Sequence, residues 1–265
     1  MSAAERFTRD KLTPKRPTGI DARTTLRHFA IVTYGVDPAA LRSHLPERFE
    51  PVCIPDAVRG PRALVSAVPF LDVDFRPAFC PWPTFTFGQT NYRAYVLDRE
   101  TNEQVAWFFG TSLDSISVLV PRLAWKLPWY RARIRFDCRY SSRDRRYERY
   151  AMSTKSEWAP VELELEDSGE PVDGLEGFPD LEHGLVVLTH PLRGFYHRRD
   201  GRLGSYHIWH DRLELTVGSV RSARFGLLDD LGLVPFSDQG SPHSVLLQHE
   251  TDFFIYLPPR VVGAP

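Results

Sequence analysis

The chain has 265 residues, a hydrophobic fraction of 42% and a formal net charge of −1 at pH 7. This length suits one large domain or two small ones and is enough to bury a core. The near-zero net charge gives no electrostatic reason to expect binding to nucleic acid or to an anionic membrane. No apolar run reaches the roughly 18 residues of a membrane span. The first residues lack the apolar core of a signal peptide, and the three cysteines show no pairing pattern, so we expect a cytoplasmic protein.

The predicted elements begin after a polar N-terminal arm. Residues 1–20 carry charges, proline and glycine, and they show no hydrophobic period. Residues 26–34 are mostly apolar and include β-branched side chains, which favours a buried strand. Asp37 is a good N-cap and Pro38 a good first helical residue, so we expect a short helix over 38–45.

The middle of the chain predicts three long strands. Residues 62–75 read as a strand in which Pro69 marks a bulge or an edge. Residues 85–98 and 104–113 are joined by a polar turn and are typical of a hairpin. Residues 115–127 are a weak helix candidate, because a proline interrupts them.

The second half adds further strands and two short helices. We expect strands over 131–140, 161–166, 192–197, 203–209, 213–217 and 245–257, and helices over 181–188 and 225–233. About ten strands with no repeat and no clear break favour a single domain over residues 21–265, in a sheet assembly that closes like a barrel.

Two blocks carry a resemblance to a known family. Residues 27–51, RHFAIVTYGVDPAALRSHLPERFEP, resemble the opening of acetoacetate decarboxylase-like proteins: an arginine-led strand, a tyrosine, and an Asp-started helix that ends at Leu-Pro-Glu. VPRLAWKLPWYRARI resembles a second block of that family, in which an arginine is followed six residues later by proline, as Arg122 is by Pro128. NYRAYVLD and VAWFFGTSLD look like an uncharacterised branch with this fold. The resemblance covers about residues 20–140 and implies a β-rich α+β fold: a mostly antiparallel β-barrel or cone with short peripheral helices.

The resemblance also bears on the chemistry. The family decarboxylates β-keto acids through a lysine Schiff base, because a protonated imine accepts the electrons left when carbon dioxide departs. The family carries two consecutive lysines directly after the proline, where this chain has Trp129 and Tyr130. Neither side chain forms an imine, so the resemblance implies an activity without this lysine. Lys126 lies nearby: either apolar surroundings lower its pKa, or it is a surface lysine whose stem covers an aromatic ring, which is the commoner case.

Arg27 matches the family position whose arginine lines the active site and handles the substrate carboxylate. A guanidinium offers a planar fork to a carboxylate. Strand alternation alone cannot say which face points inward, so an internal ion pair or an exposed strand end is an equal alternative. Gln89 stands where the uncharacterised branch leads us to expect glutamate, and glutamine cannot transfer a proton.

We therefore predict a small-molecule enzyme of the acetoacetate decarboxylase-like class that acts on a carbonyl or carboxylate compound. Arg27 and Tyr130 are the predicted catalytic residues, with Arg27 holding an anionic group and Tyr130 donating a proton. Gln89, Trp129 and Lys126 complete the predicted ligand site. One alternative is a non-catalytic small-ligand-binding barrel of the same fold, and another is a structural role with no cavity. The resemblance also implies a homo-oligomer, since family members often assemble.

The remaining motifs predict no metal, cofactor or nucleic-acid partner. His207 and His210 lie three residues apart, so on a strand they face opposite sides, which disfavours a shared metal. The segment RDRRYERY (143–150) could stack bases, but Asp144 and Glu148 favour a solvated hairpin. No phosphate-binding or dinucleotide-binding glycine motif occurs.

Overall fold

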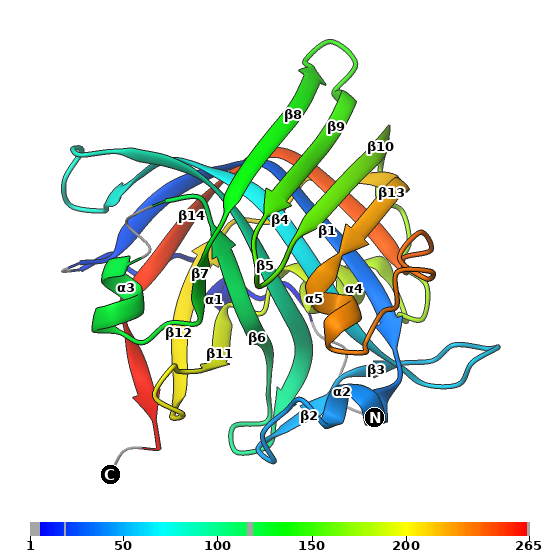
Figure 1. The fold of residues 1–265 in the computed structure, drawn as a ribbon, viewed down its shortest axis with the longest axis horizontal. Helices are drawn as coiled ribbons and strands as arrows, with labels where there is room; N and C mark the ends of the chain where they lie inside the picture. The colour runs from blue at the N-terminus through cyan, green and yellow to red at the C-terminus, as the bar shows by residue number, and fades with distance from the viewer. Residues whose placement is uncertain (1–5, 19, 116–118, 264–265) are drawn as a thin grey trace.

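The computed structural model describes residues 6–18, 20–115 and 119–263, and β-strands dominate it (Figure 1). The strands are β1 (Ala22–Val36), β2 (Phe49–Pro51), β3 (Cys53–Ile54), β4 (Arg62–Pro77), β5 (Phe85–Asp98), β6 (Glu103–Leu113), β7 (Trp129–Arg131), β8 (Arg133–Ser141), β9 (Arg146–Lys155), β10 (Val161–Pro171), β11 (Arg193–His197), β12 (Leu203–His210), β13 (Thr216–Phe225) and β14 (Ser244–Val262). The helices are α1 (Arg9–Leu12), α2 (Pro38–Arg42), α3 (Leu119–Ala124), α4 (Leu181–Thr189) and α5 (Gly226–Asp230).

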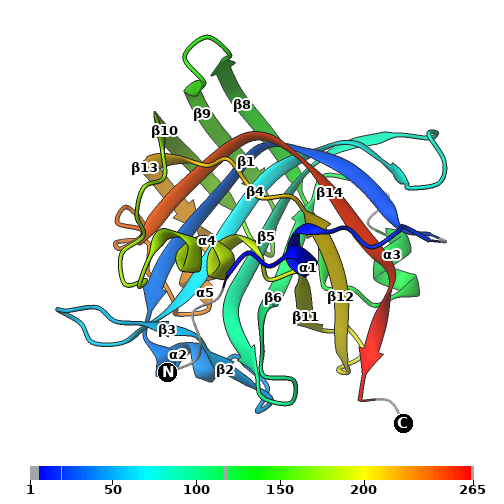
Figure 2. The same cartoon turned by 180° about the vertical axis from the view of Figure 1, so that it is seen from behind.

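The long strands close into a barrel. Their order is β1-β4-β5-β6-β11-β12-β14, and β14 pairs back with β1. Most pairs are antiparallel, while β6 is parallel to β11 and to β7. Figure 2 shows the barrel from behind, with β14 and β1 side by side across the view. The predicted acetoacetate decarboxylase-like barrel, mostly antiparallel and with short peripheral helices, is confirmed.

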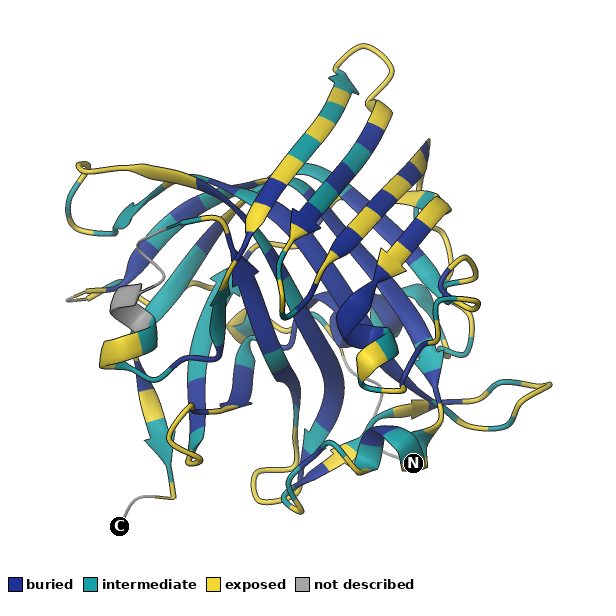
Figure 3. Cartoon of the chain, viewed as in Figure 1, coloured by how far each residue is buried: buried dark blue, intermediate teal, exposed yellow. Residues whose placement is uncertain are grey.

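Four further strands, β13, β10, β9 and β8, continue the sheet beyond the barrel (Figure 1). Their residues alternate between buried and exposed, visible as bands in Figure 3. The buried residues of this extension pack against the outer face of β1, β4 and β5 in one apolar cluster. These three barrel strands are therefore covered on both faces.

The inner face of the same strands packs with α4. Ile31 and Leu64 share an apolar cluster with Leu185 and Leu188, whereas their neighbours along the strands belong to the outer cluster. A strand buried on both faces reads as a continuous apolar run, which is why residues 26–34 predicted a buried strand. Six of the nine residues of α4 are buried, and its N-terminus is capped by Asp180.

Local sequence signals account for several element boundaries. Asp37 caps α2 as predicted, accepting from the backbone N–H of Ala39 at 2.7 Å. The pairing of β1 with β4 shifts register between Arg27 and Val32, opposite the stretch of β4 that contains Pro69. Pro69 has no N–H to donate to a ladder, so its predicted association with a bulge is confirmed.

The prediction for residues 213–233 is partly wrong. The strand there, β13, spans Thr216–Phe225 instead of 213–217, and the following helix, α5, spans Gly226–Asp230. The part of β13 that was missed, residues 218–225, is rich in serine, glycine and arginine. Such a composition lacks the run of β-branched apolar residues that predicts a strand. Its pairing with β10 and β14 supplies the order that its own sequence does not predict.

The N-terminal segment contacts the barrel at several points. Arg6 forms an ion pair with Asp180 at 2.7 Å. The backbone oxygens of Lys11 and Lys15 accept hydrogen bonds from Trp209 at 3.1 Å and Tyr256 at 3.0 Å. The division into an arm of residues 1–20 and a single domain of residues 21–265 stays a prediction. Among the described residues, no helix is both long and apolar enough to cross a membrane.

Candidate functional site

A cavity of about 300 Å³ lies inside the barrel. Its walls come from the inner faces of β1, β4, β5, β6, β12 and β14 and from the segment around β7, and most of the lining is apolar. Ile20 and Phe85 line it and are 50% and 44% exposed, so this is the side on which the cavity reaches the surface. An apolar chamber with a few polar groups is the usual form of a small-molecule site.

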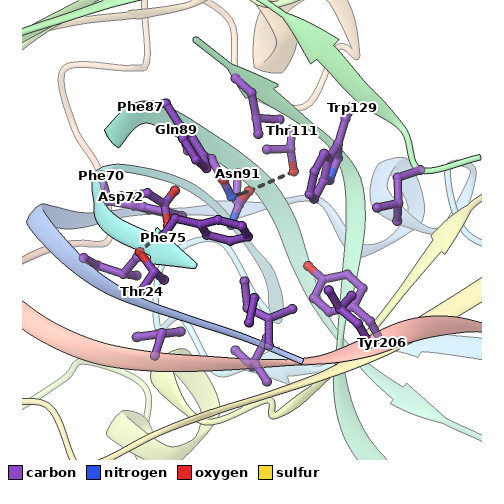
Figure 4. A pocket seen from close by; sticks show the side chains of 18 of the residues that line it. Thr24, Phe70, Asp72, Phe75, Phe87, Gln89, Asn91, Thr111, Trp129 and Tyr206 are labelled. Atoms are coloured by element: carbon purple, nitrogen blue, oxygen red, sulfur yellow. Dashed lines mark hydrogen bonds between the residues drawn. The ribbon is translucent and has the colours of Figure 1, made fainter. Parts of the chain in front are cut away.

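Strand β5 sends a row of polar side chains into the cavity. Gln89, Asn91 and Arg93 all line it, because alternate residues of a strand face the same side. The Asn91 Oδ1 atom accepts hydrogen bonds from Gln89 Nε2 at 2.9 Å and from Thr111 Oγ1 at 2.8 Å (Figure 4). These two donors fix the Asn91 amide, so its NH₂ group is left as the donor for a ligand.

Arg93 is a buried cation, only 7% exposed. Its Nη2 donates to the backbone oxygen of Leu188 at 2.7 Å, and its Nε donates to the Tyr95 hydroxyl at 3.3 Å. Leu188 lies in the last turn of α4, where carbonyl groups lack helical partners and a positive charge is favoured. Within the described part of the chain, no carboxylate forms an ion pair with Arg93.

His210 lies beside the same helix end. Its Nε2 is 2.9 Å from the backbone oxygen of Thr189, and its Nδ1 is 2.7 Å from that of Asp211. Burial lowers the pKa of His210 to about 4, and the nearby Arg93 charge acts in the same direction, while the two carbonyl contacts oppose the shift. Burial favours the neutral imidazole, whereas only the imidazolium could donate to both carbonyl oxygens, so the two effects on His210 oppose one another. Arg93 is the permanent positive charge of the lining.

A carboxyl group, Asp72, lines the same cavity. It is 2% exposed, and its Oδ1 accepts a hydrogen bond from Thr24 Oγ1 at 3.0 Å. Its Oδ2 is buried and has no hydrogen-bond partner in the described structure. Burial raises the pKa of Asp72 to about 7, and the Thr24 hydrogen bond opposes the shift only in part. Figure 4 shows Asp72 among Phe70, Phe75 and Phe87, in an apolar part of the cavity.

The Tyr206 hydroxyl points into the cavity from β12 (Figure 4). Burial raises the pKa of this phenol well above its ordinary value, so it stays protonated. It therefore adds a neutral donor on the wall opposite β5.

The structure brings together only part of the predicted site. Gln89 and Trp129 line the cavity, and Trp129 is paired in register with Thr111. Arg27, Lys126 and Tyr130 are not among the lining residues. Our expectation that all five share one pocket is therefore corrected, while any ligand role of the three outer residues stays a prediction.

Arg27 lies on the opposite face of β1 from the cavity. Its side chain is about half exposed, and Nε forms an ion pair with Glu250 at 3.1 Å. The inward-facing residues on either side are Leu26 and Phe29, because His28 adopts a left-handed φ of 52° at the bulge. Arg27 therefore forms a surface ion pair and does not line the cavity; the sequence had left both arrangements open.

Tyr130 and Lys126 are also held outside the lining. The ring of Tyr130 stacks on Trp158 with a centroid distance of 4.0 Å. Lys126 is partly buried and has a φ of 56°, and its neighbours Trp125 and Leu127 are the residues that face the cavity. None of the chain's four lysines, all of which lie in the described ranges, lines this cavity.

Asp72 and Arg93 were missed as site residues. Each is a charged residue flanked by apolar neighbours, in LDV and YRA, and that contrast is the signal that could have identified them. Among the residues that the structure describes, no group of three or more His, Cys, Asp or Glu side chains is placed to hold a metal ion.

The model of the family DUF2071, described as an uncharacterized conserved protein, matches residues 23–252. The chain belongs to this family. No curated protein sequence matches the chain.

Several solved structures share the fold. Acetoacetate decarboxylase from Legionella pneumophila is 15% identical with a TM-score of 0.56, over 96% of this chain and 94% of that one. An acetoacetate decarboxylase-like enzyme from Sphingomonas wittichii RW1 is 12% identical with a TM-score of 0.63, over 96% and 98% of the two chains. The enduracididine biosynthesis enzyme MppR, complexed with pyruvate, is 15% identical with a TM-score of 0.56, over 93% and 91%. At these identities the likeness establishes the acetoacetate decarboxylase-like fold of this DUF2071 protein.

Proposed function

We propose that this DUF2071 protein is a small-molecule enzyme of the acetoacetate decarboxylase-like class that acts on a carbonyl or carboxylate compound without a lysine Schiff base. The observation that carries the proposal is the barrel cavity, in which a buried arginine without a carboxylate partner and an oriented amide face an apolar chamber with no lysine in its lining. The similar fold of MppR, whose structure holds pyruvate, supports a small oxo acid as the ligand.

In the proposed site, two side chains of β5, Arg93 and Asn91, donate hydrogen bonds to the ligand. Arg93 Nη1 is free to donate to a ligand carboxylate, since Nε and Nη2 make the hydrogen bonds to Tyr95 and Leu188. The Asn91 NH₂ group donates to a carbonyl or carboxylate oxygen of the ligand. In a low-dielectric cavity, donors fixed before the ligand arrives stabilise negative charge that develops on that oxygen.

Gln89 and Trp129 have supporting roles in this proposal. Gln89 orients Asn91 through the 2.9 Å hydrogen bond and moves no proton itself. Trp129 supplies an apolar wall next to Thr111. The alternative function, a non-catalytic ligand-binding barrel, uses the same contacts without turnover.

A matched pair of arginine variants tests the binding part. Titration calorimetry with four- to eight-carbon 2-oxo and 3-oxo acids should detect binding to the native chain and to Arg27→Met, but strongly weakened binding to Arg93→Met. Because Arg93 also contacts α4, Asn91→Leu serves as a second cavity variant and should weaken binding too. Loss of binding in Arg27→Met alone would show that the anion site lies elsewhere.

Turnover separates the enzyme from the binding barrel. NMR should follow loss of carbon dioxide or solvent-deuterium exchange next to the carbonyl of any acid that binds. Binding without either change would favour the non-catalytic alternative. Borohydride added with a bound oxo acid should label no lysine, and labelled Lys126 would contradict the lysine-independent mechanism. A cytoplasmic location and a homo-oligomer remain part of the proposal, and light scattering of the purified chain tests the second.

A further inference from the structure

Asp72 is a buried carboxyl residue of the cavity lining that the proposed function does not use. Asp72 lines the apolar cavity, and its Oδ2 is buried and lacks a partner in the described structure. Buried polar atoms in native proteins nearly always have a hydrogen-bond partner, from the protein, water or a ligand. An unpartnered carboxyl oxygen facing a cavity is therefore a place where a ligand group can bind.

The strand register separates Asp72 from the β5 donors. Across the β4–β5 pair, Asp72 lies opposite Phe87, Val68 lies opposite Asn91, and Ser66 lies opposite Arg93. Asp72 is therefore four residues from the level of Asn91 and six from that of Arg93. At about 3.3 Å per residue these offsets are ~13 Å and ~20 Å along the strand. The cavity thus has polar groups at two separated levels, Asp72 at one and Asn91 with Arg93 at the other, and Gln89 lies between them opposite Phe70.

The two positions differ in charge. Arg93 is permanently charged. Asp72 faces Thr24 from β1 and phenylalanines from β4 and β5, while the other titratable groups of the lining are Arg93, Tyr206 and His210. None of these three contributes to the pKa of Asp72, which burial raises to about 7. Near neutral pH the carboxyl is thus protonated in a large fraction of molecules, and in that form it donates a hydrogen bond.

We propose that the cavity takes an elongated acid whose carboxylate lies at Arg93 and Asn91 and whose second oxygen, a ketone or a hydroxyl, hydrogen-bonds to Asp72. This inference rests on the proposed function and names its substrate class. A separation of ~13 Å or more corresponds to a chain of roughly ten carbons. Phe70, which lies between the two levels, and Phe87, which lies opposite Asp72, contact the methylene groups of that chain.

Three acids and two variants test this proposal. Calorimetry at pH 6 should show that 9-oxodecanoate binds the native chain about 3- to 10-fold more tightly than decanoate, which is the effect of one hydrogen bond. In Asp72→Leu the two ten-carbon acids should bind equally. In Asp72→Asn, which keeps an N–H donor, the preference for 9-oxodecanoate should remain. For the native chain that preference should shrink from pH 6 to pH 8, whereas in Asp72→Asn it should be constant.

The outcomes separate this proposal from the function on which it rests. Equal affinities of the two ten-carbon acids for the native chain, or an unchanged preference in Asp72→Leu, overturn the proposal. If pyruvate binds but neither ten-carbon acid does, the long-ligand proposal falls and the proposed function stands. If none of the three acids binds and the four- to eight-carbon oxo acids also fail to bind, both fall.

Discussion

Asp72→Asn should change how the stability of this protein depends on pH. The folded-state pKa of Asp72 is about 7, against an ordinary value of 3.8. A carboxyl whose pKa is raised on folding binds its proton more tightly in the folded state, so its contribution to stability is lost as pH rises. The window of this loss runs from about pH 4 to pH 7.

The magnitude follows from the proton linkage. Within the window, stability falls by about 1.4 kcal/mol per pH unit, or about 4 kcal/mol in total. Six histidines act in the opposite direction over part of the same range, and burial also lowers the pKa values of two of them, His197 and His249. Burial lowers the pKa values of His28, His207 and His210 to about 4, and that of His190 to about 2. Their contribution is lost as pH falls below about 6.5, so the native pH profile is a sum of opposing effects.

The difference between native and variant isolates Asp72. Urea denaturation at half-unit steps from pH 4.5 to pH 8 should show the stability of the native chain falling relative to Asp72→Asn by several kcal/mol, with no further change above pH 7.5. Asp98→Asn is the control: Asp98 is buried and ion-paired, and its pKa is lowered. Its stability difference from the native chain should be constant above pH 5. Parallel native and Asp72→Asn profiles would refute the argument that burial holds this proton.

Three further substitutions test parts of the fold. Arg48→Ala leaves the buried Asp98 carboxylate without its 2.6 Å ion-pair partner, so it should cost about 3–5 kcal/mol in chemical denaturation. Gly204→Ala places a Cβ 2.5 Å from the ring of Tyr196, where neighbouring strands prevent movement, and it should cost about 1–3 kcal/mol and lower the melting temperature. Asn102 has a φ of 55°, so Asn102→Ala should cost about 1 kcal/mol while Asn102→Gly leaves the melting temperature unchanged.

The sequence predicted the barrel because its signals are local. Alternation, continuous apolar runs and turn residues identify β4, β5 and β6 with nearly the observed bounds, and they identify the central part of β1 and the first half of β10. The Asp37 cap and the Asp-Gly turn at residues 200–201 act within a few residues of chain. The resemblance to acetoacetate decarboxylase-like proteins then fixed the way in which these strands close.

The orientation of Arg27 could not be predicted in the same way. Leu26 and Phe29 both face the cavity, although a regular strand would place residues three apart on opposite faces. The left-handed φ of His28 supplies the extra residue that changes the phase. Histidine gives no local signal for such a bulge. One extra residue in β1 therefore reverses the face to which the side chains before it point. It decides whether Arg27 lines the cavity or forms a surface ion pair with Glu250.

Local sequence signals also could not predict that Asp72 and Arg93 line the same cavity at two different levels. Each stands on its own strand at an inward position, and only the β4–β5 register gives their separation. The sequence could have identified each as a polar residue in an apolar strand. It could not supply the distance between them.

The same physical property links this cavity to the lysine chemistry that the resemblance suggested. An apolar interior favours the neutral form of any ionisable group, so it lowers the pKa of a lysine and raises the pKa of a carboxyl. With no lysine in the lining, the interior acts on Asp72 and raises its pKa to about 7, so that a large fraction of molecules near neutral pH carry a protonated carboxyl that can donate a hydrogen bond. Arginine resists this effect because its pKa is too high, and the helix-end carbonyl of Leu188 stabilises its charge. One chamber therefore holds a fixed cation and a neutral acid, which is an arrangement suited to an acid that carries a second, uncharged oxygen.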